Sequence, residues 1–121
     1  PWSGEYKDTE NNQWDVLGGS RWNDFQKNLF NHINAGRVIP IRKFSKDFAL
    51  ENEKADFVFI DGDHRYEVVL DDIINAMSWI KPGGIISGHD YGHEAWPGVA
   101  QAVDEFFPNA NKVGTIWWVQ V

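Results

Sequence analysis

A strand–helix–strand pattern in the middle of the chain constrains the fold most. Within Asp56–Ile60 the last four residues are all apolar and do not alternate with polar ones, which predicts a strand that is covered on both faces. Residues Tyr66–Ile80 then place apolar side chains at helical spacing on one face. Lys81–Gly84 fits a turn with Pro at its second and Gly at its third position, and Ile85–Gly88 predicts another strand. Together they predict a right-handed βαβ unit with two parallel strands.

Weaker patterns flank this unit on both sides. Start and stop signals such as Ser20, Gly36, Pro97 and Pro108 bound two further helices. No repeat, low-complexity tract or linker interrupts the 121 residues, so we expect a single α/β domain over residues 1–121. The other expected elements are an irregular arm over Pro1–Gly19, a helix from Ser20 to Gly36, a short strand over Arg37–Ile41, a brief helix from Ser45 to Leu50, a helix from Pro97 to Pro108 and a hairpin or pair of edge strands over Lys112–Val121.

The composition excludes several classes of protein. Lys and Arg total 11 against 18 Asp and Glu, a net charge of −7, so nucleic acids are not expected partners. The chain has no Cys, which excludes disulfides and thiolate chemistry. No apolar run approaches the roughly 20 residues that span a membrane, and no signal-peptide pattern opens the sequence. We expect a soluble, cytoplasmic protein without a membrane partner.

Two polar clusters directly follow the two strands of the βαβ unit. Asp61-Gly62-Asp63-His64 follows the first strand and His89-Asp90-Tyr91 the second. Ligands gather at the carboxyl ends of parallel strands, and Mg²⁺ takes one or two carboxylates. Asp61 and Asp90 are therefore candidate metal ligands, and His89 could add a nitrogen that favours Mn²⁺, Fe²⁺ or Zn²⁺. Alternatively, these side chains cap the following helix and satisfy local turns.

His64 is the candidate acid or base, because imidazole changes charge near neutral pH and lies three residues after Asp61. A structural hydrogen bond at the start of the following helix is an equally weighted alternative. The loop Gly92–Gly98 contains His93, Glu94 and Trp96 and is well placed to cover a substrate, although it could equally be inert.

The segments Phe57–Tyr66, Lys81–Tyr91, Gly98-Val99 and Ala102–Phe107 resemble the carboxyl-terminal half of class I S-adenosylmethionine-dependent methyltransferases. The strand-end Asp-Gly-Asp-His and the later His-Asp-Tyr are similar to the branch that contains the metal-dependent O-methyltransferases. The resemblance implies a three-layer Rossmann-like fold, with a mostly parallel sheet and an antiparallel strand near the carboxyl terminus.

The resemblance also implies roles for particular residues. Asp61, His89 and Asp90 fall on the family's metal positions, which implies a bound Mg²⁺ or Mn²⁺. His64 stands where that family has the base that deprotonates the acceptor hydroxyl. The methyl donor, S-adenosylmethionine, would lie near Ser45, Lys46 and Asp61.

The family's first two strands and its glycine-rich donor-binding turn have no counterpart before Pro1, so we expect an incomplete fold. Arg37–Ile41 would be the family's third strand and Asp56–Ile60 its fourth, with a gap between them. An open apolar edge invites pairing. Either Arg37–Ile41 closes directly onto Asp56–Ile60, or a second copy fills the gap in a homo-oligomer.

Three functions remain open at this point. The first is metal-assisted methyl transfer to a hydroxyl of a small molecule or sugar, by a shortened chain that is inactive alone. The second is a non-catalytic, oligomeric interaction module derived from the same fold. The third, a metal-dependent phosphohydrolase, is disfavoured because such sites need more His ligands than this chain offers.

Overall fold

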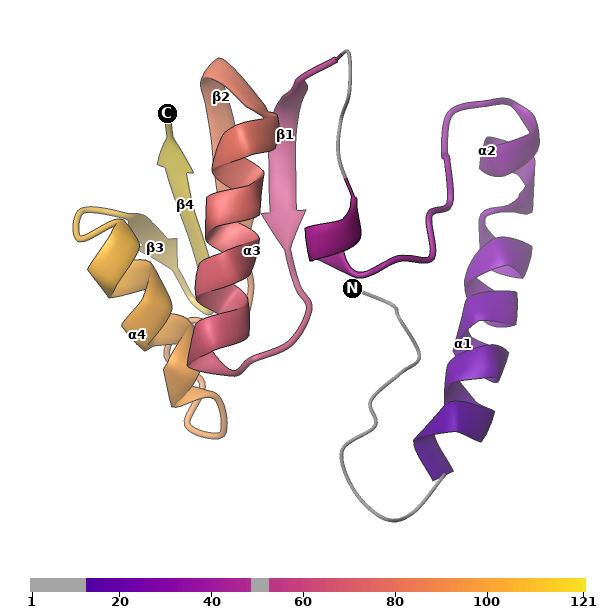
Figure 1. Cartoon of the computed structure of the whole chain (residues 1–121), viewed down its shortest axis with the longest axis horizontal. Coiled ribbons are helices and arrows are strands. Elements are labelled where there is room, and N and C mark those ends of the chain that lie inside the picture. The colour runs from indigo at the N-terminus through magenta and orange to yellow at the C-terminus, as the bar shows by residue number, and fades with distance from the viewer. Residues whose placement is uncertain (1–12, 49–52) are drawn as a thin grey trace. The chain divides into compact units, whose positions relative to one another are not determined.

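The computed structural model describes residues 13–48 and 53–121, and side chains from residue 21 onwards. The chain divides into two compact units, Pro1–Phe44 and Ser45–Val121, and each is described by itself. Their elements are labelled in Figure 1. Across the described ranges, no helix combines the length and the apolar character that crossing a membrane requires.

The first unit contains the helices α1 (Gln13–Asn28) and α2 (Phe30–Asn34). Because α1 begins at Gln13, the irregular arm expected over Pro1–Gly19 is wrong for residues 13–19, and its earlier part lies outside the described residues. The expected helix from Ser20 to Gly36 is interrupted at Leu29, whose ψ is 10°. Gly36 has a φ of +68°, the left-handed conformation that commonly ends helices, so the predicted stop signal is confirmed.

The strand expected over Arg37–Ile41 is wrong, because these residues have no regular structure. Pro40 lies in this run and lacks the N–H that a strand ladder needs. A β-rich composition therefore did not suffice to form a strand over these residues. The alternative in which Arg37–Ile41 pairs directly with Asp56–Ile60 concerns two different units and stays a prediction.

The second unit contains a four-stranded sheet in the order β1-β2-β4-β3. β1 and β2 are parallel, whereas β4 is antiparallel to both β2 and β3. The predicted βαβ unit and terminal hairpin are confirmed, but the expected mostly parallel sheet is wrong for these four strands. The elements are η1 (Ser45–Asp47), β1 (Ala55–Ile60), α3 (Tyr66–Trp79), β2 (Ile80–Gly88), α4 (Pro97–Phe106), β3 (Asn111–Val113) and β4 (Ile116–Gln120).

The helix expected from Ser45 to Leu50 corresponds to η1, and the predicted end at Leu50 lies outside the described residues. The turn expected over Lys81–Gly84 lies within β2. Ala55 is paired with Ile80 but Phe57 with Ile85, so the extra residues of β2 bulge out between these pairs. Gly83 has a φ of +83°, which is the value for the third position of a type II turn.

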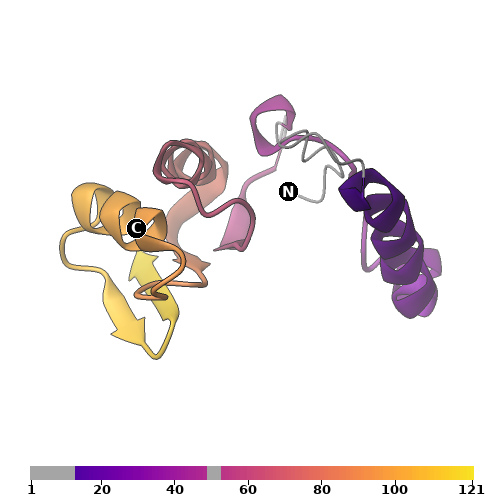
Figure 2. The same cartoon turned by 90° about the horizontal axis from the view of Figure 1, so that it is seen from below.

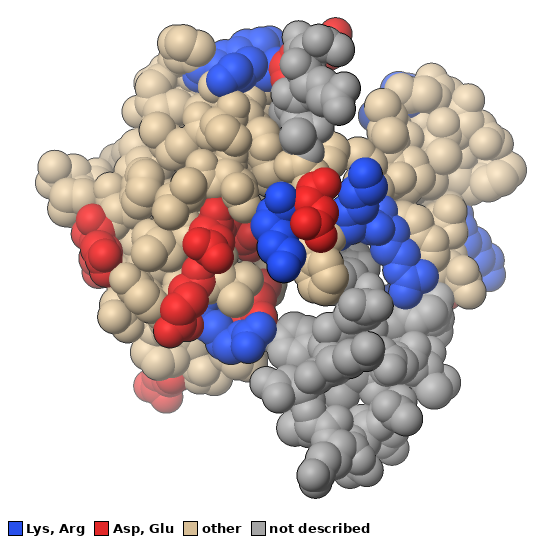
Figure 3. All heavy atoms as spheres, viewed as in Figure 1, with Lys and Arg blue, Asp and Glu red and all other residues tan. Residues whose placement is uncertain are grey.

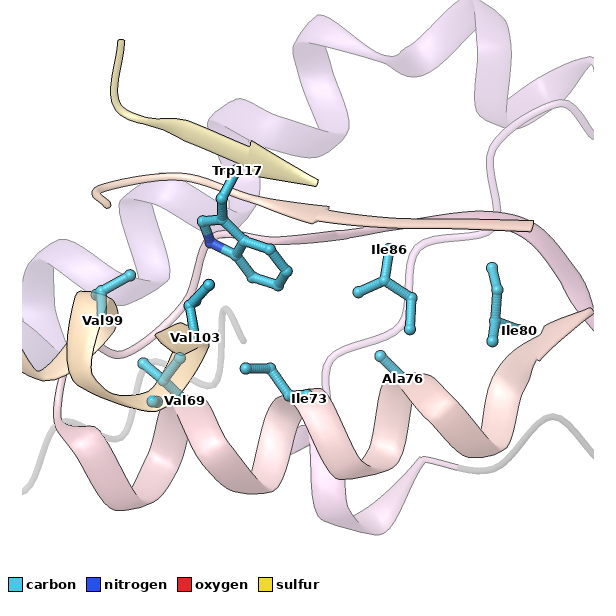
Figure 4. Packing of buried hydrophobic residues seen from close by; sticks show 9 residues of the cluster. Val69, Ile73, Ala76, Ile80, Ile86, Val99, Val103 and Trp117 are labelled. Atoms are coloured by element: carbon cyan, nitrogen blue, oxygen red, sulfur yellow. The ribbon is translucent and has the colours of Figure 1, made fainter. Parts of the chain in front are cut away.

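The hydrophobic core lies between one face of the sheet and the helices α3 and α4 (Figure 4). Trp117 on β4 is 1% exposed and Ile86 on β2 is fully buried. A Cβ at Gly88 would lie 2.7 Å from the Trp117 indole, so this position leaves room for the ring only without a side chain. The helices contribute Val69, Ile73, Ala76, Val99, Ala102 and Val103 to this core.

The opposite face of the sheet is exposed. Phe57 and Phe59 are 56% and 46% exposed, and their rings stack with centroids 6.3 Å apart. Viewed along the sheet in Figure 2, α3 and α4 lie on the same side of the strands. The second unit by itself therefore has two layers, and the three-layer fold expected for the whole chain stays a prediction. Within this unit one face of the first strand is exposed, although the sequence predicted cover on both faces.

Candidate metal and catalytic site

The parallel pairing of β1 and β2 brings both polar clusters to one edge of the sheet. Ile60 is paired with Gly88, the last residue of β2, and the N–H of His89 donates to the Ile60 carbonyl at 3.1 Å. Asp61 and Asp90 therefore follow neighbouring strand ends, as the sequence predicted. This edge is where α/β sheets generally bind ligands.

Asp90 holds the centre of the site in an unusual backbone conformation. Its φ of +59° makes it a non-glycine residue in the left-handed region, which is uncommon and often occurs at functional sites. Its carbonyl accepts a hydrogen bond from the His93 N–H at 3.2 Å. The Asp90 side chain is 14% exposed, and its Oδ2 lies 2.8 Å from His64 Nε2.

Asp61, His64 and Asp90 form a cluster of possible metal ligands. One ligand atom from each lies within 4.8 Å of the other two. An octahedral Mg²⁺ with ligands about 2.1 Å away places opposite ligand atoms about 4.2 Å apart, which is on the scale of this cluster. Two carboxylates and one imidazole suit a hard or borderline divalent cation, and Mn²⁺ accepts both ligand types.

His89 lies beside this cluster with its two nitrogens in different surroundings. Nδ1 is 3.3 Å from Asp90 Oδ1 and 3.9 Å from Asp61 Oδ1. Nε2 is 3.0 Å from the Thr115 hydroxyl in the turn between β3 and β4. The structure thus places His89 next to both predicted carboxylates. The histidine that forms a cluster of possible metal ligands with them is His64, which the sequence predicted as the acid or base. Sequence reasoning missed Thr115, since nothing in a surface turn signals its contact with a residue 26 positions away.

Asp63 belongs to the same sequence motif but has a local structural role. It is 9% exposed and accepts hydrogen bonds from the Arg65 backbone N–H at 2.9 Å and from the Arg65 guanidinium at 2.7 Å. These bonds lie directly before α3, where a carboxylate also favours the positive end of the helix. The acidic motif therefore divides into a carboxylate at the cluster, Asp61, and one that shapes the start of α3.

Ser45 and Lys46, the residues expected near the methyl donor, lie on η1. The Ser45 hydroxyl donates to Asp72 on α3, and Phe48 packs edge-on against Trp79 of the same helix at 5.4 Å. Asp72 is 5% exposed, and burial raises the pKa of its carboxyl, an effect that the Ser45 hydrogen bond partly opposes. Asp72 was missed, although it lies three residues after Val69 and so on the apolar stripe of α3.

The loop between β2 and α4 contacts His64 through Trp96. The indole stacks on the imidazole with centroids 4.4 Å apart and planes inclined by 20°. A Cβ at Gly98 would lie 2.7 Å from the His64 carbonyl oxygen, so α4 begins in direct contact with the chain that carries His64. The expectation that this loop is placed next to the site agrees with these contacts, whereas substrate covering stays a prediction.

A small pocket opens between the strand ends and the first turns of α3 and α4. Its volume is about 220 Å³, open solvent included. Pockets that enclose a drug-sized ligand are about 300–1,000 Å³, so this one suits an ion and part of a ligand. It is lined by Ile60, Asp61, Gly62, Asp63, His64, Val69, His89, Asp90, Val99 and Trp117.

Acidic side chains gather over α3 and α4 on the face that Figure 3 shows. Glu67 and Asp71 on α3 and Asp104 and Glu105 on α4 are exposed. Asp104 accepts hydrogen bonds from Lys112 and Tyr91, both at 2.9 Å, and these hold the pKa of its carboxyl below the usual range. Carboxylates on these two helices favour a nearby cation over an anion.

Comparison with known proteins identifies the family. A family described as a methyltransferase domain matches residues 8–91, which is more than half of the chain and includes parts of both units. The chain therefore belongs to this methyltransferase-domain family. An uncharacterised protein of Acanthamoeba polyphaga mimivirus is 32% identical over 81 residues, which cover 61% of this chain and 37% of that protein. The chain thus matches little more than a third of that relative, and the single domain expected from the sequence stays a prediction.

Proposed function

We propose that this chain contributes the metal and acceptor half of a metal-assisted O-methyltransferase. The main observation is the approach of His64 Nε2 to Asp90 Oδ2 at 2.8 Å, with Asp61 in the same cluster at the strand ends. Membership of the methyltransferase-domain family supports methyl transfer as the reaction class. The acceptor would be a hydroxyl of a small molecule or sugar, and the methyl donor would be S-adenosylmethionine.

The proposal assigns each residue of the cluster a role. Asp61 and Asp90 would hold Mg²⁺ or Mn²⁺, with His89 as a further ligand. A bound divalent cation lowers the pKa of a coordinated hydroxyl. His64 would accept the proton of the acceptor hydroxyl, whose oxygen then forms a bond to the methyl carbon as the bond from that carbon to the donor sulfur breaks. Ser45, Lys46 and Asp61 would lie on the donor side.

A Mn²⁺ titration tests the metal half of this proposal. Asp61→Asn and Asp90→Asn each remove one carboxylate, so we expect both to weaken Mn²⁺ binding by about tenfold or more, the scale on which such sites depend on individual groups. Asp71→Asn is the matched control, because Asp71 is an exposed carboxylate on α3. Calorimetry should show unchanged binding for this control. Equal Mn²⁺ affinity in all four proteins would contradict the metal site.

A titration with S-adenosylmethionine tests the donor half. The family's glycine-rich donor-binding turn is not found in this sequence, so we expect weak or no binding by this chain alone. Micromolar binding would contradict that expectation and would show that the donor site is formed by other residues. The same titration in the presence of Mn²⁺ shows whether the two sites are coupled.

A second candidate is an interaction module in which a second copy covers the sheet. It is favoured by the exposed Phe57, Phe59 and Ile85 and by the free edge of β1, which has no described neighbouring strand. Such apolar edges commonly pair with another chain. The double variant Phe57→Ser, Phe59→Ser should then shift the mass in light scattering towards the monomer. Ile39→Ser, at a residue 79% exposed in the first unit, is the control. A monomeric starting protein would exclude this candidate.

A further inference from the structure

We propose that Trp96 is a positioning residue for His64, which holds the imidazole in the orientation that contacts Asp90. Its importance for catalysis rests on the role proposed for His64 above. The contact itself is independent of that role. The indole and imidazole are stacked nearly parallel, with centroids 4.4 Å apart and planes inclined by 20°. Stacked aromatic pairs prefer a defined relative orientation, so the indole limits the rotation of the smaller ring.

His64 needs such a constraint because a single hydrogen bond does not fix a ring. Among the described residues, the imidazole is hydrogen-bonded only through Nε2, to Asp90 Oδ2. In neutral imidazole one nitrogen donates and the other accepts. A neutral ring that donates from Nε2 to the Asp90 carboxylate keeps its lone pair on Nδ1, which is the form that can take up a proton. Rotation of the ring would lose this arrangement, and the stacked indole opposes that rotation.

The loop that carries Trp96 is fixed well enough to act as a support. The Trp96 N–H donates to the His93 carbonyl at 2.9 Å, and the Ala95 N–H donates to His93 Nδ1 at 3.2 Å. Immediately afterwards, Gly98 packs so closely that a Cβ would lie 2.7 Å from the His64 carbonyl oxygen. The backbone two residues after Trp96 is therefore in contact with the backbone of His64.

Packing alone does not account for this position of Trp96. It is 42% exposed, whereas Trp117, which does fill the core, is 1% exposed. A side chain with this much exposed surface contributes less to global stability than one in the core. Its principal described ring contact is with His64, and His93 lies farther away at 6.3 Å with a tilted ring. The contact is thus directed at the imidazole that lies nearer to Asp90, at 2.8 Å against 3.3 Å for His89.

The test measures the imidazole of His64 directly by NMR in the metal-free 121-residue chain, kept in a chelator at one fixed pH. The readout is the solvent exchange rate of the Nε2 proton. In Trp96→Leu we expect this rate to rise by about 3- to 10-fold, the ratio that one aromatic pair supports. Trp96→Phe retains an aromatic ring and should stay close to wild type. Asp90→Asn shows how the signal changes when the carboxylate partner is lost.

Trp79→Leu is the matched control, since it removes an indole that packs on Phe48 away from the cluster. It should leave the His64 signal unchanged, and melting curves establish that each variant is folded. An unchanged exchange rate in Trp96→Leu would overturn the proposal, as would an equal increase in Trp96→Phe or Trp79→Leu. The measurement needs no metal, donor or acceptor. Failure of the Mn²⁺ titration would therefore overturn the proposed function without affecting this result.

Discussion

The two units of this chain contrast in what their helices bury. In Ser45–Val121, α3 and α4 pack their apolar stripes against the sheet and enclose residues such as Ile73 and Val103, which are fully buried. In Pro1–Phe44, none of the side chains that the structure describes, from residue 21 onwards, is buried. Trp22, Phe25, Leu29 and Ile33 recur at helical spacing there, yet each is only half-buried.

This difference shows that an amphipathic pattern predicts a helix but not its stability. Most helical stability in proteins comes from packing of the apolar face, because isolated helices of this length are marginal in water. α3 has such packing within its own unit. α1 has a described stacking contact between Trp22 and Phe25, with centroids 5.6 Å apart, but no described buried residue. We therefore expect substitutions in the two units to differ in cost.

Removal of a core indole should have the largest effect. Trp117→Ala removes a residue that is 1% exposed, and we expect a loss of about 3–5 kcal/mol in unfolding free energy. Trp22→Ala makes the same chemical change in the first unit and should cost less than about 1 kcal/mol, because its ring is only half-buried. Denaturant unfolding followed by circular dichroism measures both. Equal costs would abolish the contrast between the units.

Gly98→Ala should have the next largest effect on stability, and it should also change the surroundings of His64. The new Cβ would lie 2.6 Å from the Tyr66 backbone nitrogen, and such overpacking costs about 1–3 kcal/mol. We expect the NMR signals of His64 to shift as α4 moves. Gly36→Ala is the counterpart in the first unit. It has open space but a φ of +68°, so it should cost about 1 kcal/mol without changing His64. Unchanged His64 signals in Gly98→Ala would contradict the close contact.

Asp72→Asn should have a larger effect on the pH dependence of the unfolding free energy than on its magnitude. Burial raises the pKa of Asp72 above its unfolded value, so the folded protein retains a proton that the unfolded chain has lost. Stability should therefore fall as pH rises from the ordinary aspartate range to the raised pKa, and stay level above it. Asn can still accept the Ser45 hydrogen bond and should abolish this decline. Asp71→Asn, at an exposed carboxylate, is the control. The same slope of unfolding free energy against pH in wild type and Asp72→Asn would contradict a buried carboxylate here.

Asp104→Asn should have the smallest effect on the pH dependence of stability, and its sign should be opposite to that of Asp72→Asn. Hydrogen bonds from Lys112 and Tyr91 lower the Asp104 pKa, so the stability they provide is present above the unfolded pKa and disappears as pH falls through the lowered value. The carboxylate is half exposed, and solvent screens such pairs strongly. Thermal unfolding of both variants across acid pH compares the slopes. A larger change of the pH slope in Asp104→Asn than in Asp72→Asn would contradict the expectation that the buried carboxylate has the larger effect.

Part of the fold was predictable because its signals are local. The apolar run before Asp61 and the stripe from Val69 to Ala76 record burial with a fixed period, so β1 and α3 were predicted within a few residues. The positive φ of Gly83 followed from the Pro-Gly pattern. The strand predicted over Arg37–Ile41 is not formed, because β propensity carries no information about whether a partner strand is available. The exposed Phe57 was missed for a similar reason, since a continuous apolar run does not show which face is covered.

The candidate site was predictable to the same extent. Asp61 and Asp90 follow strand ends, and parallel strands bring such residues together whatever their side chains contact. The partners of each side chain were not predictable. The contacts of His64 with Asp90 and of His89 with Thr115 each join residues 26 positions apart.

The sequence by itself thus determined the local elements, the edge of the sheet that carries the polar clusters and the chemistry that their residues can perform. The tertiary structure decided that His64 contacts Asp90 and stacks on Trp96, that Asp63 accepts hydrogen bonds from Arg65, and that one face of the sheet is exposed. The physical reason is that periodicity and turn chemistry act over a few residues, whereas side-chain partners depend on strand order, register and helix packing across the whole unit.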